Sequence, residues 1–272
     1  MSIFENQFRL ANDADGIYSR MIDKSWDNGA GRIFGGYTAA LSLAAAAAIS
    51  PHPELCSFHI LFLEPVSSGL ITFEVNALRI GRAVAAVQVA GQQNDRKVLS
   101  SQVWLRPAMI TAAAADATID LQHHDPERAV RLPWFTEIYE FHNWMDTRVV
   151  DYAWSLEESL TDGDNRSVDL WSRPRTGEIS PGFYSQLYDV ILADGHIGSS
   201  QTRSSSTDPR RILSLDLSMQ WAPALPRTGW RRMRAYSPPE AAGFAACAAT
   251  IFDRSGALCA TASQQTWTAP LR

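Results

Sequence analysis

The sequence predicts an α+β protein in which one unit, a helix followed by antiparallel strands, occurs twice. Three observations carry this prediction. An alanine-rich segment begins after a double glycine, β-rich segments with turn residues follow it, and the same order returns in the second half. A short apolar helix followed by a long antiparallel meander is best buried when the sheet curls around the helix. We therefore expect two helices, each wrapped by a curved antiparallel sheet.

The first helix is predicted in the stretch GRIFGGYTAALSLAAAAAIS, residues 31–50. Because it has almost no polar face, other parts of the chain have to surround it on most sides. Gly35 and Gly36 stand at its start, where glycine lets another group come close to the main-chain N–H groups. A strand over residues 56–66 follows, then three strands between residues 69 and 107, with turns at Gly81-Arg82 and at residues 94–96.

The second half repeats this order. A helix is predicted in SPGFYSQLYDVILADGHIG, residues 180–198, with Ser180 as its cap and Pro181 at its first position. One strand follows over residues 212–225, and three more lie between residues 229 and 268. Two further strands are expected before the helix, at residues 140–150 and 166–175.

The repeat determines the expected domain organisation. A period of about 160 residues is too long for a solenoid and fits two fused copies of one domain. We expect an N-terminal domain over residues 1–107, a linker over residues 108–135 and a C-terminal domain over residues 136–272.

Composition limits the partners. The formal charge of −5 and the pI near 5.7 provide no basic field for nucleic acid. The longest apolar run, residues 39–49, is about half the length of a membrane span, and the acidic N-terminus has no apolar leader. The three cysteines have neither paired nor metal-binding spacing, which is typical of a reducing compartment. We expect a cytoplasmic protein without a metal, a membrane or a nucleic-acid partner.

Six stretches of the chain resemble those of a known family in their order and spacing. They are RIFGGYTAA, CSFHILFLEPV and VNALRIGRAV in the first half, and LADGHI, ILSLDLSMQWAPAL and GFAACAATIFDRSGALCATASQQ in the second. In combination they resemble the acyl-CoA thioesterase II family. The resemblance implies a tandem, or double, hotdog fold whose two sheets pair into one, and hydrolysis of an acyl-CoA substrate without a cofactor. It also implies a homodimer or a higher homo-oligomer.

The resemblance also implies three catalytic residues. The family uses an Asp near the end of the second helix, a Thr on the next strand and a Gln on the last strand to hold and polarise a water. These positions correspond to Asp194, Ser214 and Gln264. Serine keeps the hydroxyl group but lacks the methyl group that restricts χ1. Gln265 points to the opposite face of the same strand, so the register decides which glutamine faces the pocket.

The chemistry of thioester hydrolysis fits these residue types. It needs an attacking water, a base that takes its proton and donors that face the developing oxyanion. Partial burial and the negative helix end both raise the pKa of Asp194 toward that of a useful base. The first-half helix has no carboxylate, and the first-half counterpart of Gln264 falls near Trp104. One active centre per chain is therefore expected.

Further residues are candidates for substrate contacts. We expect the amides around Gly36 or Tyr37, next to Gly35, to face the thioester carbonyl, although tight helix–strand packing explains the glycines equally well. Three arginines are candidates for the CoA phosphates, although surface strands also carry such residues for solubility: Arg82, Arg232 and Arg234. Alternation puts Arg232 and Arg234 on one face of a strand and Arg231 on the other.

Two other functions stay open. A hydratase or dehydratase of the same fold pairs an Asp with a His a few residues later, whereas Asp194 and His196 lie about 200° apart around a helix. A non-catalytic acyl-CoA-binding protein would keep the pocket and lose the polar trio. The fold alone does not decide between them.

Overall fold

The computed structural model describes residues 2–108, 125–131, 139–150, 167–202, 210–222 and 229–270. The elements of the first half are α1 (Ile3–Asn6), β1 (Ala11–Ala14), β2 (Ile17–Ile22), the 3₁₀ helix η1 (Lys24–Trp26), α2 (Gly35–Ala48), β3 (Glu54–Phe62), β4 (Gly69–Ile80), β5 (Ala85–Gln93) and β6 (Arg96–Arg106).

The elements of the second half repeat this order of a helix and antiparallel strands, with four described elements before the helix. They are β7 (Val130–Arg131), the 3₁₀ helix η2 (Glu140–Trp144), β8 (Met145–Val149), β9 (Ser167–Pro174), α5 (Phe183–His196), α6 (Ser199–Thr202), β10 (Arg210–Ser214), β11 (Asp216–Trp221), β12 (Arg231–Tyr236), β13 (Phe244–Asp253) and β14 (Leu258–Pro270).

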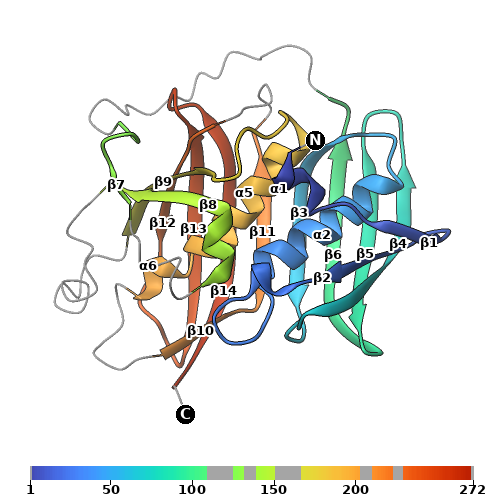
Figure 1. Ribbon diagram of the computed structural model, residues 1–272, viewed down its shortest axis with the longest axis horizontal. Coiled ribbons are helices and arrows are strands. Elements are labelled where there is room, and N and C mark those ends of the chain that lie inside the picture. Colours follow the sequence, from blue (N-terminus) through green and yellow to red (C-terminus); the bar gives the residue numbers. More distant parts are fainter. Residues whose placement is uncertain are drawn as a thin grey trace.

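The described strands form one antiparallel sheet in the order β1-β2-β4-β5-β6-β3-β11-β14-β13-β12-β9-β8-β7, with β10 beside β14. The central pair β3–β11 joins the two halves, with Leu61 opposite Asp216. The helices α2 and α5 pack against each other on one face of this sheet (Figure 1). The predicted α+β fold, with two helices and two sheets that pair into one, is confirmed.

The core lies between the helices and the sheet. Four alanines of α2 are fully buried: Ala39, Ala40, Ala45 and Ala46. Their small side chains let the apolar face of the neighbouring helix α5 pack closely against α2. The Trp26 ring stacks on Tyr37 of α2 at 4.3 Å and on Trp144 of η2 at 5.0 Å between ring centroids, so aromatic contacts connect the halves. No helix of the described chain is long and apolar enough to cross a membrane.

Some sequence predictions differ from the structure. The cap at Ser180 is wrong: α5 begins at Phe183, and Gly182, with φ 85°, is its N-cap. The reason is that the Ser180 N–H donates to the Glu5 carboxylate of α1 at 2.6 Å, which draws this segment toward the N-terminus. Residues 140–144 of a predicted strand form η2, and the strands β1 and β2 have no counterpart in the prediction.

The proposed domain boundaries stay a prediction. Most of the expected linker, residues 108–135, lies outside the described residues, and its described part contains β7.

Each half contains a β-bulge near the middle of the sheet. In β3, two steps from Leu55 to Ser57 oppose one step from Leu105 to Trp104, so Cys56 is the extra residue. The Gln186 side chain of α5 holds this bulge. Its Oε1 accepts from the Leu55 N–H at 2.8 Å, and its Nε2 donates to the Leu55 carbonyl at 2.8 Å.

We expect Gln186→Leu to lower the free energy of unfolding by about 2–4 kcal/mol, because a buried N–H and a buried carbonyl lose their partners. Urea unfolding measures this change. Gln102→Leu, at an exposed position of β6, is the control and should stay within about 0.5 kcal/mol of the wild type. Equal effects of the two substitutions would contradict the role of Gln186.

Candidate active site

Asp194 receives hydrogen bonds from three different elements. It lies in the last turn of α5 and is half-buried. Gln264 of β14 donates from Nε2 to Asp194 Oδ1 at 2.6 Å. The Ser214 hydroxyl of β10 and the Gly36 N–H of α2 also hydrogen-bond to this carboxylate. The structure therefore brings Asp194, Ser214 and Gln264 together, and adds Gly36 from the other half.

The double glycine makes this approach possible. A Cβ at Gly35 would lie 2.9 Å from Asp194 Oδ2, and a Cβ at Gly36 would lie 2.6 Å from two ring atoms of Phe34 and 3.1 Å from Asp194 Cβ. Side chains at these positions would collide with the carboxylate or with the ring. The two glycines thus let the positive end of α2 contact the carboxylate of α5.

Tyr37, the third residue of this group, faces elsewhere. Its N–H donates to the Phe34 carbonyl at 3.2 Å, and its hydroxyl donates to the Gln7 carbonyl at 2.9 Å. The side chain therefore connects α2 to the N-terminal segment.

The register of β14 distinguishes the two glutamines. Gln264 is buried and faces Asp194, whereas Gln265 donates from Nε2 to the Ala245 carbonyl at 3.1 Å. An ionised carboxylate only accepts hydrogen bonds, so the Gln264 amide has to present its NH₂ group to Asp194. Its Oε1 is then turned away and makes no hydrogen bond to any described residue. Buried acceptors of this kind are unusual and indicate a place for a water or a ligand.

Burial changes the acid–base behaviour of Asp194. It raises the pKa of this carboxyl group from the usual 3.8 to about 6, against the hydrogen bonds from Gln264, Ser214 and Gly36, which lower it. A carboxyl group with this pKa is ionised at neutral pH and still basic enough to accept a proton.

Aromatic rings lie on one side of the carboxylate, next to the double glycine. Phe62 of β3 belongs to the inward row of Phe58 and Ile60 but is only half-buried, and a Cβ at Gly35 would lie 3.3 Å from its ring. Phe34 stacks on Phe141 of η2 at 3.9 Å between centroids. Both halves therefore contribute apolar walls next to Asp194.

The equivalent positions of the first half are apolar. Ala46 of α2 occupies the helix position that Asp194 occupies in α5, since both helices have 14 residues. Counted from the bulges, Leu55 corresponds to Ser214, and Val103 corresponds to Gln264. The counterpart of Gln264 is thus Val103, the inward-facing neighbour of Trp104. All three residues are buried.

The candidate arginines lie apart from Asp194 in the described chain. Arg232 donates twice to Asp169, both at 2.7 Å, and Arg234 donates to the same carboxylate at 3.0 Å. Arg231 binds Asp189 of α5 at 2.9 Å, on the other face of β12, as the alternation predicts. Arg82 is exposed in the turn between β4 and β5.

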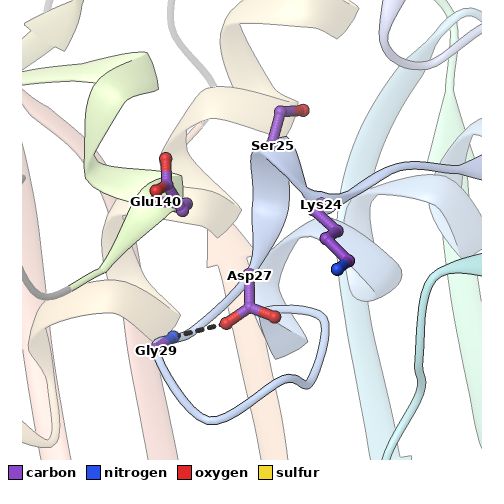
Figure 2. A pocket seen from close by; sticks show the side chains of 5 residues that line it. All are labelled: Lys24, Ser25, Asp27, Gly29 and Glu140. Atoms are coloured by element: carbon purple, nitrogen blue, oxygen red, sulfur yellow. Dashed lines mark hydrogen bonds between the residues drawn. The ribbon is translucent and has the colours of Figure 1, made fainter.

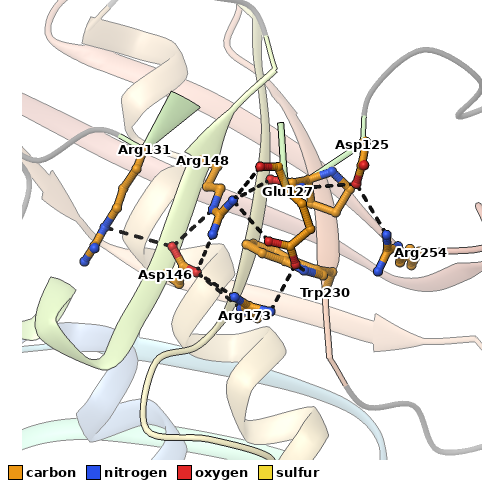
Figure 3. Close-up of polar contacts among 9 residues, drawn as sticks. Asp125, Glu127, Arg131, Asp146, Arg148, Arg173, Trp230 and Arg254 are labelled. Carbon is orange, nitrogen blue, oxygen red and sulfur yellow. Dashed lines mark hydrogen bonds and ion pairs between the residues drawn. The ribbon is translucent and has the colours of Figure 1, made fainter. Parts of the chain in front are cut away.

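The sequence reasoning missed a second group of arginines on the C-terminal half (Figure 3). It comprises Arg131, Arg148, Arg173 and Arg254, in ion pairs with Asp125, Glu127 and Asp146. The Trp230 ring interacts with the guanidinium groups of Arg148 at 4.9 Å and Arg173 at 4.3 Å. These contacts attach residues 125–131 to β8 and β9. The carboxylates neutralise the positive charge of the arginines.

A surface cavity of about 450 Å³ lies beside η1 and η2 (Figure 2). Its lining includes Lys24, Ser25, Asp27, Gly29 and Glu140. The Asp27 carboxylate accepts from the Gly29 N–H at 2.7 Å and orders the loop that leads to α2. These five residues include none of the predicted site residues, and two carboxylates make this cavity unfavourable for phosphate groups.

Fold and site together define the class: a double hotdog protein in which polar groups of both copies meet at Asp194. The family follows from the sequence. The acyl-CoA thioesterase N-terminal domain matches residues 22–106, and the acyl-CoA thioesterase C-terminal domain matches residues 122–268. The chain belongs to the acyl-CoA thioesterase family. No functionally curated protein is similar enough in sequence to match.

Solved structures share this fold over nearly the whole length of both chains. Acyl-CoA thioesterase II TesB2 of Mycobacterium marinum is 19% identical, with a TM-score of 0.76 and coverage of 98% of each chain. The tesB protein of Mycobacterium avium subspecies paratuberculosis is 19% identical, with a TM-score of 0.79 and coverage of 98% of each chain. A hotdog-fold protein of Alicyclobacillus acidocaldarius is 16% identical, with a TM-score of 0.82 and full coverage of both chains.

The raised pKa predicts that Asp194→Asn stabilises the protein in a pH-dependent way. Because the folded state favours neutral Asp194, its contribution to stability is present below pH 4 and is lost as the pH rises through about 6. Asparagine stays neutral, so the variant should gain about 2–4 °C in Tm over the wild type at pH 8, and less at pH 4. Calorimetry at both pH values measures this. Glu74→Gln, at an exposed position of β4, is the control, and a pH-independent difference for Asp194→Asn would contradict the prediction.

Proposed function

We propose that this protein hydrolyses acyl-CoA thioesters with a water that Asp194, Ser214 and Gln264 position. The observation that carries this proposal is the buried Gln264 Oε1, which has no hydrogen-bond partner among the described residues and lies beside a carboxylate with a pKa of about 6. A water between them donates one hydrogen bond to Gln264 Oε1 and the other to the Asp194 carboxylate. Its oxygen then has lone pairs free for attack.

The thioester carbonyl belongs at the N-terminal turn of α2. The Gly36 N–H donates to Asp194 and the Tyr37 N–H to the Phe34 carbonyl, whereas the Gly35 N–H makes no hydrogen bond to a described residue. A helix N-terminus with an unused N–H group and no side chain in the way stabilises a developing oxyanion. We therefore assign the oxyanion contact to Gly35 and the orientation of the base to Gly36.

The reaction balances without a cofactor. Asp194 takes a proton from the water while the water oxygen bonds to the carbonyl carbon, and the carbonyl π electrons move to the oxygen. When the tetrahedral intermediate collapses, the C–S bond breaks and the electron pair leaves with the sulfur of CoA. The proton on Asp194 passes to this thiolate, which leaves a free acid and the CoA thiol. Thiolates are good leaving groups because the pKa of a thiol is near 8.5.

The hydratase alternative needs a histidine beside the aspartate. His196 is buried, with Nε2 at 3.5 Å from Thr147 Oγ1 and its ring at 5.1 Å from the His142 ring. Burial lowers the pKa of His196 to about 4. The Asp194 carboxylate faces Gly36, Ser214 and Gln264, whereas the His196 ring lies beside Thr147 and His142.

The first test is hydrolysis of a panel of acyl-CoA thioesters, from acetyl to palmitoyl and including aromatic acyl groups, followed by thiol release. We expect the wild type to turn over part of the panel and Asp194→Asn to lose at least about 10²-fold in kcat, since general-base catalysis contributes about 10²–10⁴-fold. Glu74→Gln should retain the wild-type rate. Binding without turnover would establish an acyl-CoA-binding protein, and hydration of crotonyl-CoA without hydrolysis would establish the hydratase; either result overturns the proposal.

A second test concerns the double glycine. The Cβ of Gly35→Ala would lie 2.9 Å from Asp194 Oδ2 and displace the carboxylate, and a displacement of about 1 Å can cost about 10²-fold in rate. We expect a loss of about 10–100-fold in kcat with a native circular dichroism spectrum. The control is Gly198→Ala, whose Cβ meets only Ile212 at 3.5 Å. Full activity of Gly35→Ala would show that the carboxylate does not have to stay where α2 holds it.

A further inference from the structure

The strand that carries Ser214 contains one extra residue. Four steps from Ser214 to Ser218 oppose only three steps from Thr266 to Ser263 on β14. The β-bulge at Leu215 separates β10 from β11, which the sequence predicts as one continuous strand.

This bulge decides where Ser214 points. Side chains alternate along a regular strand, so residues 214, 216, 218 and 220 would share one face. Gln220 is exposed, and Ser218 meets the exposed His59, so this is the outer face. The extra residue shifts the alternation by one. Ser214 is therefore opposite the buried Thr266 and faces Asp194.

Asp216 holds the bulge. Its Oδ1 accepts a hydrogen bond from the Gln265 N–H at 2.7 Å. The Gln265 carbonyl accepts from the Leu215 N–H at 2.9 Å, and the Leu215 carbonyl accepts from the Phe62 N–H at 2.9 Å. The carboxylate thus replaces the main-chain acceptor that the bulge takes away from Gln265. The residues just before Leu215 and Gln265 are Ser214 and Gln264.

We propose that Asp216 is the positioning residue of the site: by accepting the Gln265 N–H it maintains the bulge that turns the Ser214 hydroxyl toward Asp194 and keeps Gln264 in register. This rests on the proposed function for its catalytic consequence. Asp216 itself lies on the outer face and acts only through Ser214 and Gln264.

The first half contains an independent parallel. Its bulge at Cys56 is also held by a side chain, the Gln186 amide, which binds Leu55. A bulge at this place of the sheet therefore has a side-chain partner in both copies.

The test compares three substitutions of Asp216. Asp216→Asn keeps an acceptor oxygen in the same place and should retain activity within about threefold. Asp216→Ala removes the acceptor, and Asp216→Glu keeps the charge but moves the oxygen by one methylene group. Both should lower kcat by about 10–100-fold with little change in KM. If Asp216→Ala fails to fold, the comparison of Asn with Glu gives the same answer. An inactive Asp216→Asn variant together with an active Asp216→Glu variant would overturn the proposal.

Two readouts separate positioning from a general loss of structure. Loss of the Ser214 hydrogen bond should raise the pH at which kcat/KM falls on the acid side, because that bond lowers the pKa of Asp194. In addition, Ser214→Ala should cost activity in the wild type and almost none in Asp216→Ala. Additive losses, or an unchanged pH profile, would show that Asp216 does not act through Ser214.

The proposal can also be tested if the wild type hydrolyses none of the panel, a result that would overturn the function alone. The Tm of Asp216→Ala should then fall more steeply than that of the wild type between pH 6 and 8, and this difference should vanish in the Asp194→Asn background. Parallel curves would overturn the role of Asp216.

Discussion

The pairing of β3 with β11 is the interaction on which the rest of the structure depends. It turns two sheets into one and sets α2 and α5 side by side on the same face. Only in this arrangement does the start of α2 meet the last turn of α5, so that Gly36 can donate to Asp194. The same strand pair brings Phe62 of β3 next to the carboxylate. The site is therefore a property of the joined sheet, and neither half contains it alone.

Within that frame, two opposing effects act on Asp194. Removal from water disfavours the ionised carboxylate, and the three donors favour it. Since burial is the larger effect, the folded protein carries a carboxylate that costs stability at neutral pH. A group that costs stability and is nevertheless surrounded by matched donors is more typical of a functional site than of a structural ion pair. The ion pair between Asp189 of the same helix and Arg231 of β12 shows the contrast, because there each charge has a direct opposite charge.

Much of this could be read from the sequence, and the exceptions have physical reasons. The apolar helix, the order of the strands and the close approach at the double glycine were predicted from the local sequence pattern. The three polar residues were predicted once the family was recognised. The direction of the Ser214 side chain could not be predicted in this way, because strict alternation puts it on the outer face with Ser218 and Gln220. The conflict between that alternation and the predicted catalytic role of Ser214 is the signal that could have revealed the bulge. The start of α5 was missed for a related reason: Ser180 is bound by Glu5, 175 residues away in the chain.

The bulge has a consequence for the ancestry of the protein. It occurs at the same place in both copies, yet only one copy combines it with a carboxylate, a hydroxyl and an amide. In the other copy the corresponding side chains are Ala46, Leu55 and Val103. A backbone irregularity at the same place in both halves agrees with two copies of one domain, whereas the three polar side chains belong to the second half alone. The two copies thus contribute unequally: the first provides apolar packing and the N-terminal turn of α2, and the second provides the three polar side chains.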